Sequence, residues 1–271
     1  MLGLGASTYG SLIGAGGGFI MVPVMLVVFP GETPSVITAT SLVAVFANGV
    51  SGSLAYARQR RIDYSSAVTF GLSTIPGSVL GAYATRFVVR GPFDALMGVV
   101  LLGLSAFLIF RQPPVQVLSG QRPGHTLRVI ADASGVSYSY SYSRTLAIGF
   151  GLGAGVIAAF FGVGGGIVLV PLMIQFLHFP PPIATATGVA VFLITAIAAN
   201  TTHFLSGTLV GVYDRALALA LGAVIGGQLG AWASRRLRAI WLVRALALGL
   251  ALVGVRLIAS GWGDVAALLL R

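Results

Sequence analysis

The sequence contains no cysteine and no lysine, and it has few charged residues of either sign. Without cysteine, neither a disulfide nor a thiolate metal site can form. Charged residues make up only 8% of the chain, whereas soluble globular proteins carry about 25%. The chain therefore lacks the polar surface that a water-soluble protein needs. No charged segment follows Met1, so the sequence predicts no cleavable signal peptide.

Apolar and small residues are in excess instead. Hydrophobic residues make up 56% of the 271 residues, and the mean hydropathy is +0.96. Apolar runs of roughly 20 residues recur along the chain, and this length crosses about 30 Å of hydrocarbon. The 38 glycines favour helices that pack closely through small residues over a barrel of alternating strands. We predict an all-α polytopic membrane protein.

The net charge of +10 rests on 16 basic residues, all of them arginine. They lie at the ends of the apolar runs instead of forming one patch, which is the pattern of the positive-inside rule. We therefore expect a lipid bilayer as partner, and no nucleic acid. No acid pair, Gly-x-Ser-x-Gly or His-Glu-x-x-His motif lies inside an apolar run, so we expect neither an enzyme nor a cofactor or metal site.

A glycine-rich stretch occurs twice. Gly14–Leu26 and Gly162–Ile174 are identical at seven of thirteen positions without a gap, and they lie 148 residues apart. Each contains three consecutive glycines, Gly16–Gly18 and Gly164–Gly166. Glycine costs about 1 kcal/mol against alanine inside a helix. The sequence therefore predicts an internal duplication with a broken element in each half.

The duplication divides the chain into four segments. Residues 1–111 are the first transmembrane repeat, 112–143 an extramembrane linker, 144–260 the second repeat and 261–271 a C-terminal tail. Each repeat is predicted to begin with its broken element and to continue with three spans: Ser35–Ala57, Tyr64–Val88 and Phe93–Phe110, then Ile183–Leu205, Tyr213–Ser234 and Ile240–Ile258.

The linker is polar and predicts structure of its own. Thr126–Ala131 and Val136–Tyr142 alternate apolar or aromatic with polar residues around Asp132-Ala133-Ser134-Gly135. This pattern is typical of a β-hairpin outside the membrane. We expect a passive linker, because connections are generally variable surface. The alternative is a gate or a regulatory contact.

Arginine placement bears on topology. If each broken element spans the membrane, the protein has eight full spans. The arginines after the predicted span Ser35–Ala57 and those after Tyr213–Ser234 then fall on opposite sides of the membrane. If each element enters and leaves on one side, the repeats are inverted and most arginines share one side. Arms of 11–13 residues reach about 16–20 Å, which suits a half-crossing. We favour two inverted repeats, each a re-entrant element followed by three transmembrane helices, with the arginine-rich side and the central linker cytoplasmic.

The glycine runs are the predicted binding site. A helix that starts after them directs free N–H groups and its positive dipole end into the protein, and without Cβ atoms an anion can approach those amides. The simpler interpretation is close helix packing. The duplicated pattern, ending in Pro23 and Pro171, favours an anion site. The predicted binding residues are Gly16, Gly17, Gly18, Thr40, Ser41, Asn48, Gly164, Gly165, Gly166, Thr187 and Thr195.

Four further residues are considered for coupling. His203 and His178 are the candidates for proton transfer, because histidine titrates near neutral pH; a structural role is the alternative for both. Asp63 and Asp214 precede the third element of each repeat, where we expect them to cap helices.

The sequence resembles the sulfite exporter TauE/SafE family, also called the 4-toluene sulfonate uptake permease family. The resemblance rests on Gly14–Pro23, Gly162–Pro171, Ala39–Leu42 and Arg61–Tyr64. It implies a carrier of sulfur-containing anions (sulfite, thiosulfate, sulfoacetate or related organosulfonates) in the cytoplasmic membrane. Thr187-Gly188 departs from the pattern, where Thr40-Ser41 stands in the first repeat.

The resulting hypothesis is a secondary transporter that works by alternating access. A passive anion channel and a non-transporting membrane binding or assembly protein are the alternatives. A homodimer is compatible with each of them.

Overall fold

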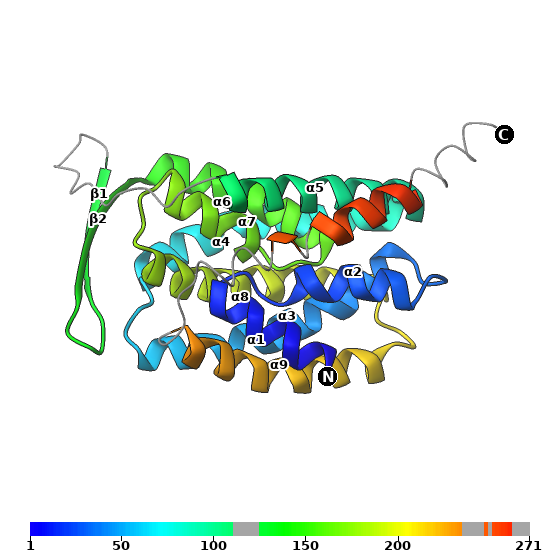
Figure 1. Ribbon diagram of the computed structural model, residues 1–271, viewed down its shortest axis with the longest axis horizontal. Coiled ribbons are helices and arrows are strands. Elements are labelled where there is room, and N and C mark those ends of the chain that lie inside the picture. Colours follow the sequence, from blue (N-terminus) through cyan, green and yellow to red (C-terminus); the bar gives the residue numbers. More distant parts are fainter. Residues whose placement is uncertain (111–124, 235–246, 249–250, 262–271) are drawn as a thin grey trace.

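The computed structural model describes residues 1–110, 125–234, 247–248 and 251–261. Helices dominate it, with one two-stranded antiparallel sheet (Figure 1). The elements are α1 (Leu2–Ile13), α2 (Gly18–Val28), α3 (Pro34–Arg58), α4 (Tyr64–Ala84), η1 (Thr85–Phe87), α5 (Arg90–Phe110), β1 (His125–Ala131), β2 (Ser137–Ser143), α6 (Arg144–Phe161), α7 (Gly166–Gln175), α8 (Pro181–Leu205) and α9 (Tyr213–Ala233).

Six helices in the described part of the chain are long and apolar enough to cross a membrane. They are Pro34–Arg58, Tyr64–Phe87, Arg90–Phe107, Arg144–Phe161, Pro181–Leu205 and Tyr213–Ala233. Five of them confirm predicted spans to within a few residues. Most of the sixth predicted span, Ile240–Ile258, lies outside the described residues, which include a shorter apolar helix over Ala251–Gly261.

The sixth observed helix of this length is α6, which the sequence interpretation treated as one arm of a broken element. It reaches 18 residues because it begins directly after β2, where the Ser143 side chain accepts a hydrogen bond from the Leu146 amide. The arm is therefore longer than the 11–13 residues expected.

Both broken elements occur where the glycine runs predict them. Gly14 and Gly16 separate α1 from α2 and have φ angles of 77° and 71°, in the left-handed region. Gly162 and Gly164 separate α6 from α7 with φ angles of 67° and 70°. Residues other than glycine rarely adopt these φ angles. The first helix of each broken element therefore ends at an equivalent glycine.

The β-hairpin lies at one end of the bundle, the left end in Figure 1, which we call the hairpin end. The predicted strands and turn are confirmed, with Arg128 paired to Tyr140 in the register. Arg61, just after α3, forms an ion pair with Asp132 in the turn, and Gln59 Nε2 donates to the Ala231 carbonyl near the end of α9. The ends of α3 and α9 therefore lie here.

The opposite end holds the start of α5, the end of α8 and the start of α9. Arg90 donates to the carbonyls of Phe29, Pro30 and Glu32, each at 3.0 Å, and also to the Leu26 carbonyl. These contacts satisfy the free carbonyls at the end of α2. Arg215 pairs with Glu32 at 2.7 Å, and Arg86 donates to Ser206. Consequently α3 runs toward the hairpin end, and α8 runs away from it.

Glycines on α4 and α9 set the closest helix packing. A Cβ on Gly77 or Gly81 would meet the backbone of α6, and one on Gly226 or Gly230 would meet the backbone of α1. Each pair joins one half of the chain to the other, and the two pairs are equivalent. Small residues allow this approach, as expected for a membrane bundle.

The two expected caps differ. Asp63 caps α4, because its side chain accepts a hydrogen bond from the Ser66 amide. Asp214 lies within the first turn of α9, after the N-cap Val212, and makes no cap bond. The prediction for Asp214 was therefore wrong: α9 begins one residue before the aspartate, which places the carboxylate inside the helix.

Candidate functional site

The two glycine runs cross in contact with each other. A Cβ on Gly18 would strike the carbonyl oxygen of Gly162, and a Cβ on Gly166 would strike the carbonyl oxygen of Gly14. The start of α2 therefore packs on the break before α7, and the start of α7 packs on the break before α2. Neither contact leaves room for a side chain.

Beside the crossing, each glycine break also packs against a helix of the other half. A Cβ on Gly14 would lie 2.8 Å from Cα of Thr185 on α8, and one on Gly162 would lie 2.7 Å from Cα of Thr38 on α3. Ser41 on α3 donates its hydroxyl to the Gly162 carbonyl at 2.9 Å. Gly188 is the equivalent position on α8, and a Cβ there would lie 3.4 Å from the Gly14 carbonyl oxygen. A serine hydroxyl therefore bonds to the Gly162 carbonyl, and the equivalent position at the Gly14 carbonyl has no hydroxyl.

Backbone donors gather at the crossing. Within the described residues, no acceptor pairs with the amides of Gly16 through Phe19 or of Gly164 through Ile167. The first four N–H groups of a helix have no partner inside that helix. Gly17, at the start of α2, is buried, and a Cβ there would meet the backbone of Ala6 and Ser7. Two sets of buried donors, each at a positive dipole end, therefore lie close together.

Asn48 has a free donor in this region. Its Oδ1 accepts a hydrogen bond from Ser11 Oγ at 2.7 Å, while its Nδ2 has no partner in the described part of the chain. Ser7, one turn before Ser11 on the same face of α1, also has an unpartnered hydroxyl. Both Asn48 and Ser7 are fully buried. Buried polar groups are normally hydrogen-bonded, so these two donors are free to bind a polar ligand or a water molecule.

Thr195 is the equivalent of Asn48 in the second repeat. Its hydroxyl oxygen lies 2.9 Å from the Thr74 hydroxyl oxygen and 3.1 Å from the Val191 carbonyl oxygen, and these two acceptors share its one hydrogen. A Cβ on Gly165 would lie 3.6 Å from this hydroxyl oxygen. Thr195 therefore lies at the second glycine run, as predicted, although its hydroxyl already has protein partners.

The two other predicted threonines make different bonds. Thr40 donates to the Val36 carbonyl within its own helix. Thr187 accepts a hydrogen bond at 3.0 Å from the amide of Asp63, at the hairpin end. Neither hydroxyl therefore bonds to a glycine of the crossing.

The histidines proposed for coupling lie apart from each other. His203 is fully buried near the end of α8, and neither ring nitrogen has a partner in the described residues. Its equivalent, Tyr56, donates its hydroxyl to the Ser11 carbonyl. His178 is exposed in the α7–α8 connection and has a φ of 57°. His203 is at the opposite end from the hairpin, and His178 is at the hairpin end.

Ser7 and Ser11 are the polar residues that sequence reasoning missed. They are four residues apart in α1 and so face one side of that helix. Two serines spaced four residues apart in a helix of small residues were the pattern that could have indicated them. Ser11 could not be recognised from the sequence because its partner, Asn48, lies on another helix.

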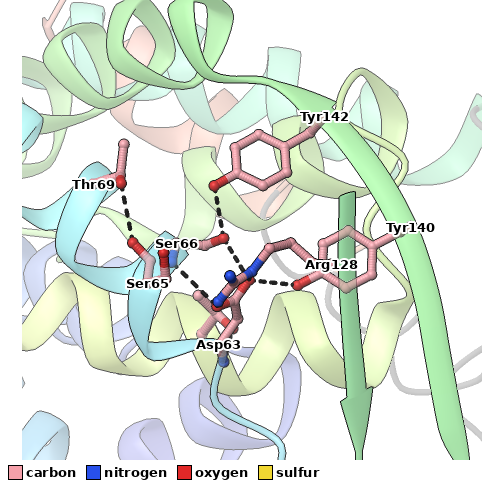
Figure 2. Close-up of polar contacts among 8 residues, drawn as sticks. Asp63, Ser65, Ser66, Thr69, Arg128, Tyr140 and Tyr142 are labelled. Carbon is pink, nitrogen blue, oxygen red and sulfur yellow. Dashed lines mark hydrogen bonds and ion pairs between the residues drawn. The ribbon is translucent and has the colours of Figure 1, made fainter. Parts of the chain in front are cut away.

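A second buried polar cluster lies where the hairpin meets the bundle, and Asp63 is its centre (Figure 2). Arg128 from β1 donates to both carboxylate oxygens, at 2.6 and 3.1 Å. The Tyr140 hydroxyl from β2 donates to Oδ2 at 2.7 Å. Ser66 Oγ donates to Oδ2 at 2.5 Å and lies 2.8 Å from the Tyr142 hydroxyl. The carboxylate is therefore fully satisfied.

These contacts control the charge on the hairpin interface. Burial alone would raise the pKa of Asp63, but hydrogen bonds from Arg128, Ser66 and Tyr140 lower it below its ordinary value of 3.8. Burial likewise acts against ionisation of Asp132, and hydrogen bonds from Arg61 and from the Ser134 and Val136 amides lower its pKa. Burial together with the neighbouring Asp63 charge raises the pKa of Tyr140. Both carboxylates are thus charged and both ion pairs intact at neutral pH.

Docking of the hairpin is expected to be constant from about pH 5 to pH 8 and to weaken only below about pH 4. Both aspartates have lowered pKa values in the docked state. Their stabilisation is therefore complete above the ordinary value of 3.8 and is lost as the pH falls through the lowered values. Hydrogen exchange of the hairpin amides, corrected for the intrinsic rate, measures this. Protection that already declines between pH 7 and pH 5 would contradict it.

Comparison with known proteins agrees with this architecture. The profile of the family described as "Sulfite exporter TauE/SafE" matches residues 1–257. The chain belongs to this family. It is a multi-pass membrane transporter, and the earlier resemblance is confirmed.

Relatives of this TauE/SafE protein carry transporter names rather than enzyme names. A probable membrane transporter protein of Bacillus subtilis, YunE, is 34% identical over 269 residues, which cover 96% of each chain. A probable membrane transporter protein of Xylella fastidiosa (strain Temecula1) is 27% identical, covering 94% of this chain and 92% of its own. One from Methanocaldococcus jannaschii is 22% identical, covering 82% and 79%. No solved structure matches.

Proposed function

We propose that this TauE/SafE protein is a secondary transporter of small sulfur-containing anions, such as sulfite, thiosulfate, sulfoacetate or related organosulfonates, in the cell membrane. The observation that carries the proposal is the crossing of two glycine breaks, each followed by a helix whose first amides have no acceptor in the described chain. Helix N-termini bind oxyanions through such amides and through the positive end of the dipole.

Side chains at the crossing suit an anion that must bind and leave again. Asn48 Nδ2 and the Ser7 hydroxyl are buried donors without partners, and Ser11 holds the Asn48 amide through its Oδ1. Uncharged donors bind an anion less tightly than an arginine does. The buried acidic residues that the structure describes, Asp63, Asp94 and Asp132, lie in connections or at helix starts. No described carboxylate therefore repels an anion at the crossing.

We also propose that the halves are inverted repeats. The equivalent helices α3 and α8 run in opposite directions between the two ends of the bundle. Figure 1 shows the hairpin, the start of α6 and the end of α3 at the same end. Phe150 on α6 and Phe176 after α7 have ring centroids 5.6 Å apart. This contact supports a re-entrant element, because it brings the end of α7 back beside the first part of α6.

Arginine placement supports a cytoplasmic location for the hairpin end. Arg58 ends α3 there, Arg60 and Arg61 follow it, and Arg144 begins α6. Arg86, Arg90 and Arg215 lie at the opposite end. The predicted linker arginines Arg111 and Arg122, and Arg235, Arg236 and Arg238 after α9, are outside the described residues. Of the described arginines named here, more lie at the hairpin end, which supports placing that end inside.

Alternating access follows from this arrangement. The crossing lies between the two repeats, and each repeat supplies one glycine run and the helix that packs on the other run. Rocking of one repeat against the other would open the crossing to one end of the bundle at a time. His203 and His178 remain the candidates for proton coupling.

Uptake by proteoliposomes tests the function. Sulfite, thiosulfate, sulfoacetate and sulfate are offered to vesicles that contain the protein, with and without a pH gradient, and an organic cation serves as a negative substrate. We expect saturable flux of at least one sulfur anion and none of the cation. Flux without saturation or dependence on any gradient would indicate a channel. Absence of anion flux from folded protein would overturn the proposal.

A further inference from the structure

The hairpin joins the two halves of the molecule at one end. Its second strand continues directly into α6, since β2 ends at Ser143 and α6 begins at Arg144. Its polar contacts, however, are with the first half. Arg128 and Tyr140 bond to Asp63, and Asp132 pairs with Arg61, both in the connection between α3 and α4. A segment attached to the second repeat thus holds the first.

The strand register divides the hairpin into two different faces. On β2, serines and tyrosines alternate from Ser137 to Ser143. Tyr138, Tyr140 and Tyr142 stand opposite Ile130, Arg128 and Thr126, whereas Ser137, Ser139 and Ser141 stand opposite Ala131, Val129 and Leu127. Side chains alternate between the two faces of a strand. The face with Arg128 and the tyrosines covers the bundle, and Leu127 and Val129 are exposed on the other.

The covered face also contacts the second half. The rings of Tyr140 and Tyr142 lie 4.4 and 5.0 Å from the ring of Phe179, in the connection before α8. Phe179 in turn lies 6.1 Å from Phe70 on α4. Beneath them, the Asp63 amide donates to Thr187 on α8. Tyrosines, phenylalanines and the Asp63 cluster therefore close the hairpin end across the boundary between the repeats. Figure 2 shows the part of this contact that Tyr140, Tyr142 and the Asp63 cluster make.

We propose that the hairpin, residues 125–143, is a latch that keeps the hairpin end closed and must release Asp63 each time that end opens. The inference rests on the proposed alternating access. Any movement that separates the α3–α4 connection from the start of α8 breaks the Asp63–Thr187 bond. It also pulls Asp63 away from Arg128 and Tyr140, because these two residues move together with α6 and the second repeat.

The chemistry of Asp63 makes the latch act as a unit. Its side chain is fully buried in the closed arrangement, and a buried carboxylate without its partners is unfavourable. Release of Arg128 alone would leave that charge buried. Partial opening is therefore disfavoured, and the contacts break together once water reaches Asp63. Weakening the latch should bias the protein toward the arrangement that is open at the hairpin end.

Cysteine labelling tests this in the full chain, because the natural sequence has no cysteine. Ala186→Cys and Ala39→Cys place single reporters at equivalent positions of α8 and α3. Both alanines are fully buried. Ala186 belongs to the apolar cluster that includes Tyr140 and Tyr142, and Ala39 packs with Leu209 and Val212 at the opposite end. Each reporter is combined with Arg128→Gln, and labelling by a water-soluble maleimide is timed.

We expect Arg128→Gln to speed labelling at residue 186 by about tenfold, while labelling at residue 39 stays constant or slows. Arg86→Gln removes a bond to Ser206 at the opposite end; it is the matched arginine control and should not speed labelling at residue 186. Tyr140→Phe removes one bond to Asp63 but keeps the ring against Phe179. It serves if Arg128→Gln fails to fold, and should give a smaller increase at residue 186 alone.

Equal acceleration at both reporters, or no change at residue 186 in folded protein, would overturn the latch. Labelling needs no substrate, so the result is independent of the transported anion. If labelling changes at residue 186 alone but the protein carries no anion in vesicles, the latch stands and the proposed function is overturned.

Discussion

Gly166→Ala is expected to reduce anion flux about 100-fold and to lower the thermal stability of the protein. A Cβ at this position would overlap the carbonyl oxygen of Gly14 and lie 3.1 Å from Cα of Ala15. Both obstacles are backbone atoms of the other repeat, so no side-chain rotation can relieve the overlap. Overpacking in a tight core costs about 1–3 kcal/mol, and about 1.4 kcal/mol corresponds to a factor of ten. Initial rates in proteoliposomes and unfolding in detergent measure the two effects.

Gly153→Ala is the matched control on the preceding helix. Gly153 lies in α6, and a Cβ there would meet no atom of the described residues within 4 Å. Alanine in a helix is about 1 kcal/mol more favourable than glycine. This variant should transport like the natural protein and unfold at the same or a slightly higher temperature. If Gly166→Ala behaved as Gly153→Ala does, the crossing would not be the tight contact on which the proposed site depends.

Asn48→Asp is expected to reduce anion flux at neutral pH at least 100-fold. Aspartate keeps the shape of the side chain and the oxygen that accepts from Ser11. The change turns the free Nδ2 donor into a carboxylate oxygen in a fully buried position. Two like charges brought together cost several kcal/mol, which corresponds to roughly two or more factors of ten. Flux and sulfite binding, measured as protection against thermal unfolding, provide the test.

Gln228→Glu is the control for Asn48→Asp, because it makes the same amide-to-carboxylate change at a different position. Gln228 lies on α9, and its Nε2 donates to the Ser51 carbonyl at 2.8 Å. The same amide-to-carboxylate exchange therefore removes a bond between helices instead of a free donor. We expect Gln228→Glu to lower stability and to retain most of the flux per folded molecule. Equal losses of flux in both variants would mean that Asn48 acts in packing.

Much of the fold could be predicted because local backbone chemistry determines it. The positive φ angles at Gly14 and Gly162 occur where the glycine runs predict a break. The alternation of serine and tyrosine predicts β2, and Asp132 to Gly135 predicts its turn. Such patterns depend on neighbouring residues in the chain. They need no knowledge of what packs against them.

The site was less predictable because its contacts join distant segments. Asn48 was proposed from its depth in an apolar span, but its partner Ser11 lies 37 residues away. Thr187 shares its sequence context with Thr40, yet it accepts a bond from Asp63 while Thr40 bonds within its helix. Duplicated sequence predicts equivalent backbones. It does not predict equal partners once the surrounding side chains differ.

The hydroxyl of Ser41 has a consequence for the resting state. In an inverted repeat, the inward-open and outward-open forms arise by exchanging the conformations of the two halves, so identical halves would make both forms equally stable. Ser41 holds the Gly162 carbonyl, whereas Gly188 offers no hydroxyl to the Gly14 carbonyl. A hydrogen bond contributes about 1 kcal/mol. If it is kept in only one form, that form is populated about fivefold over the other, and in the proposed mechanism the empty carrier waits for its anion predominantly on one side of the membrane.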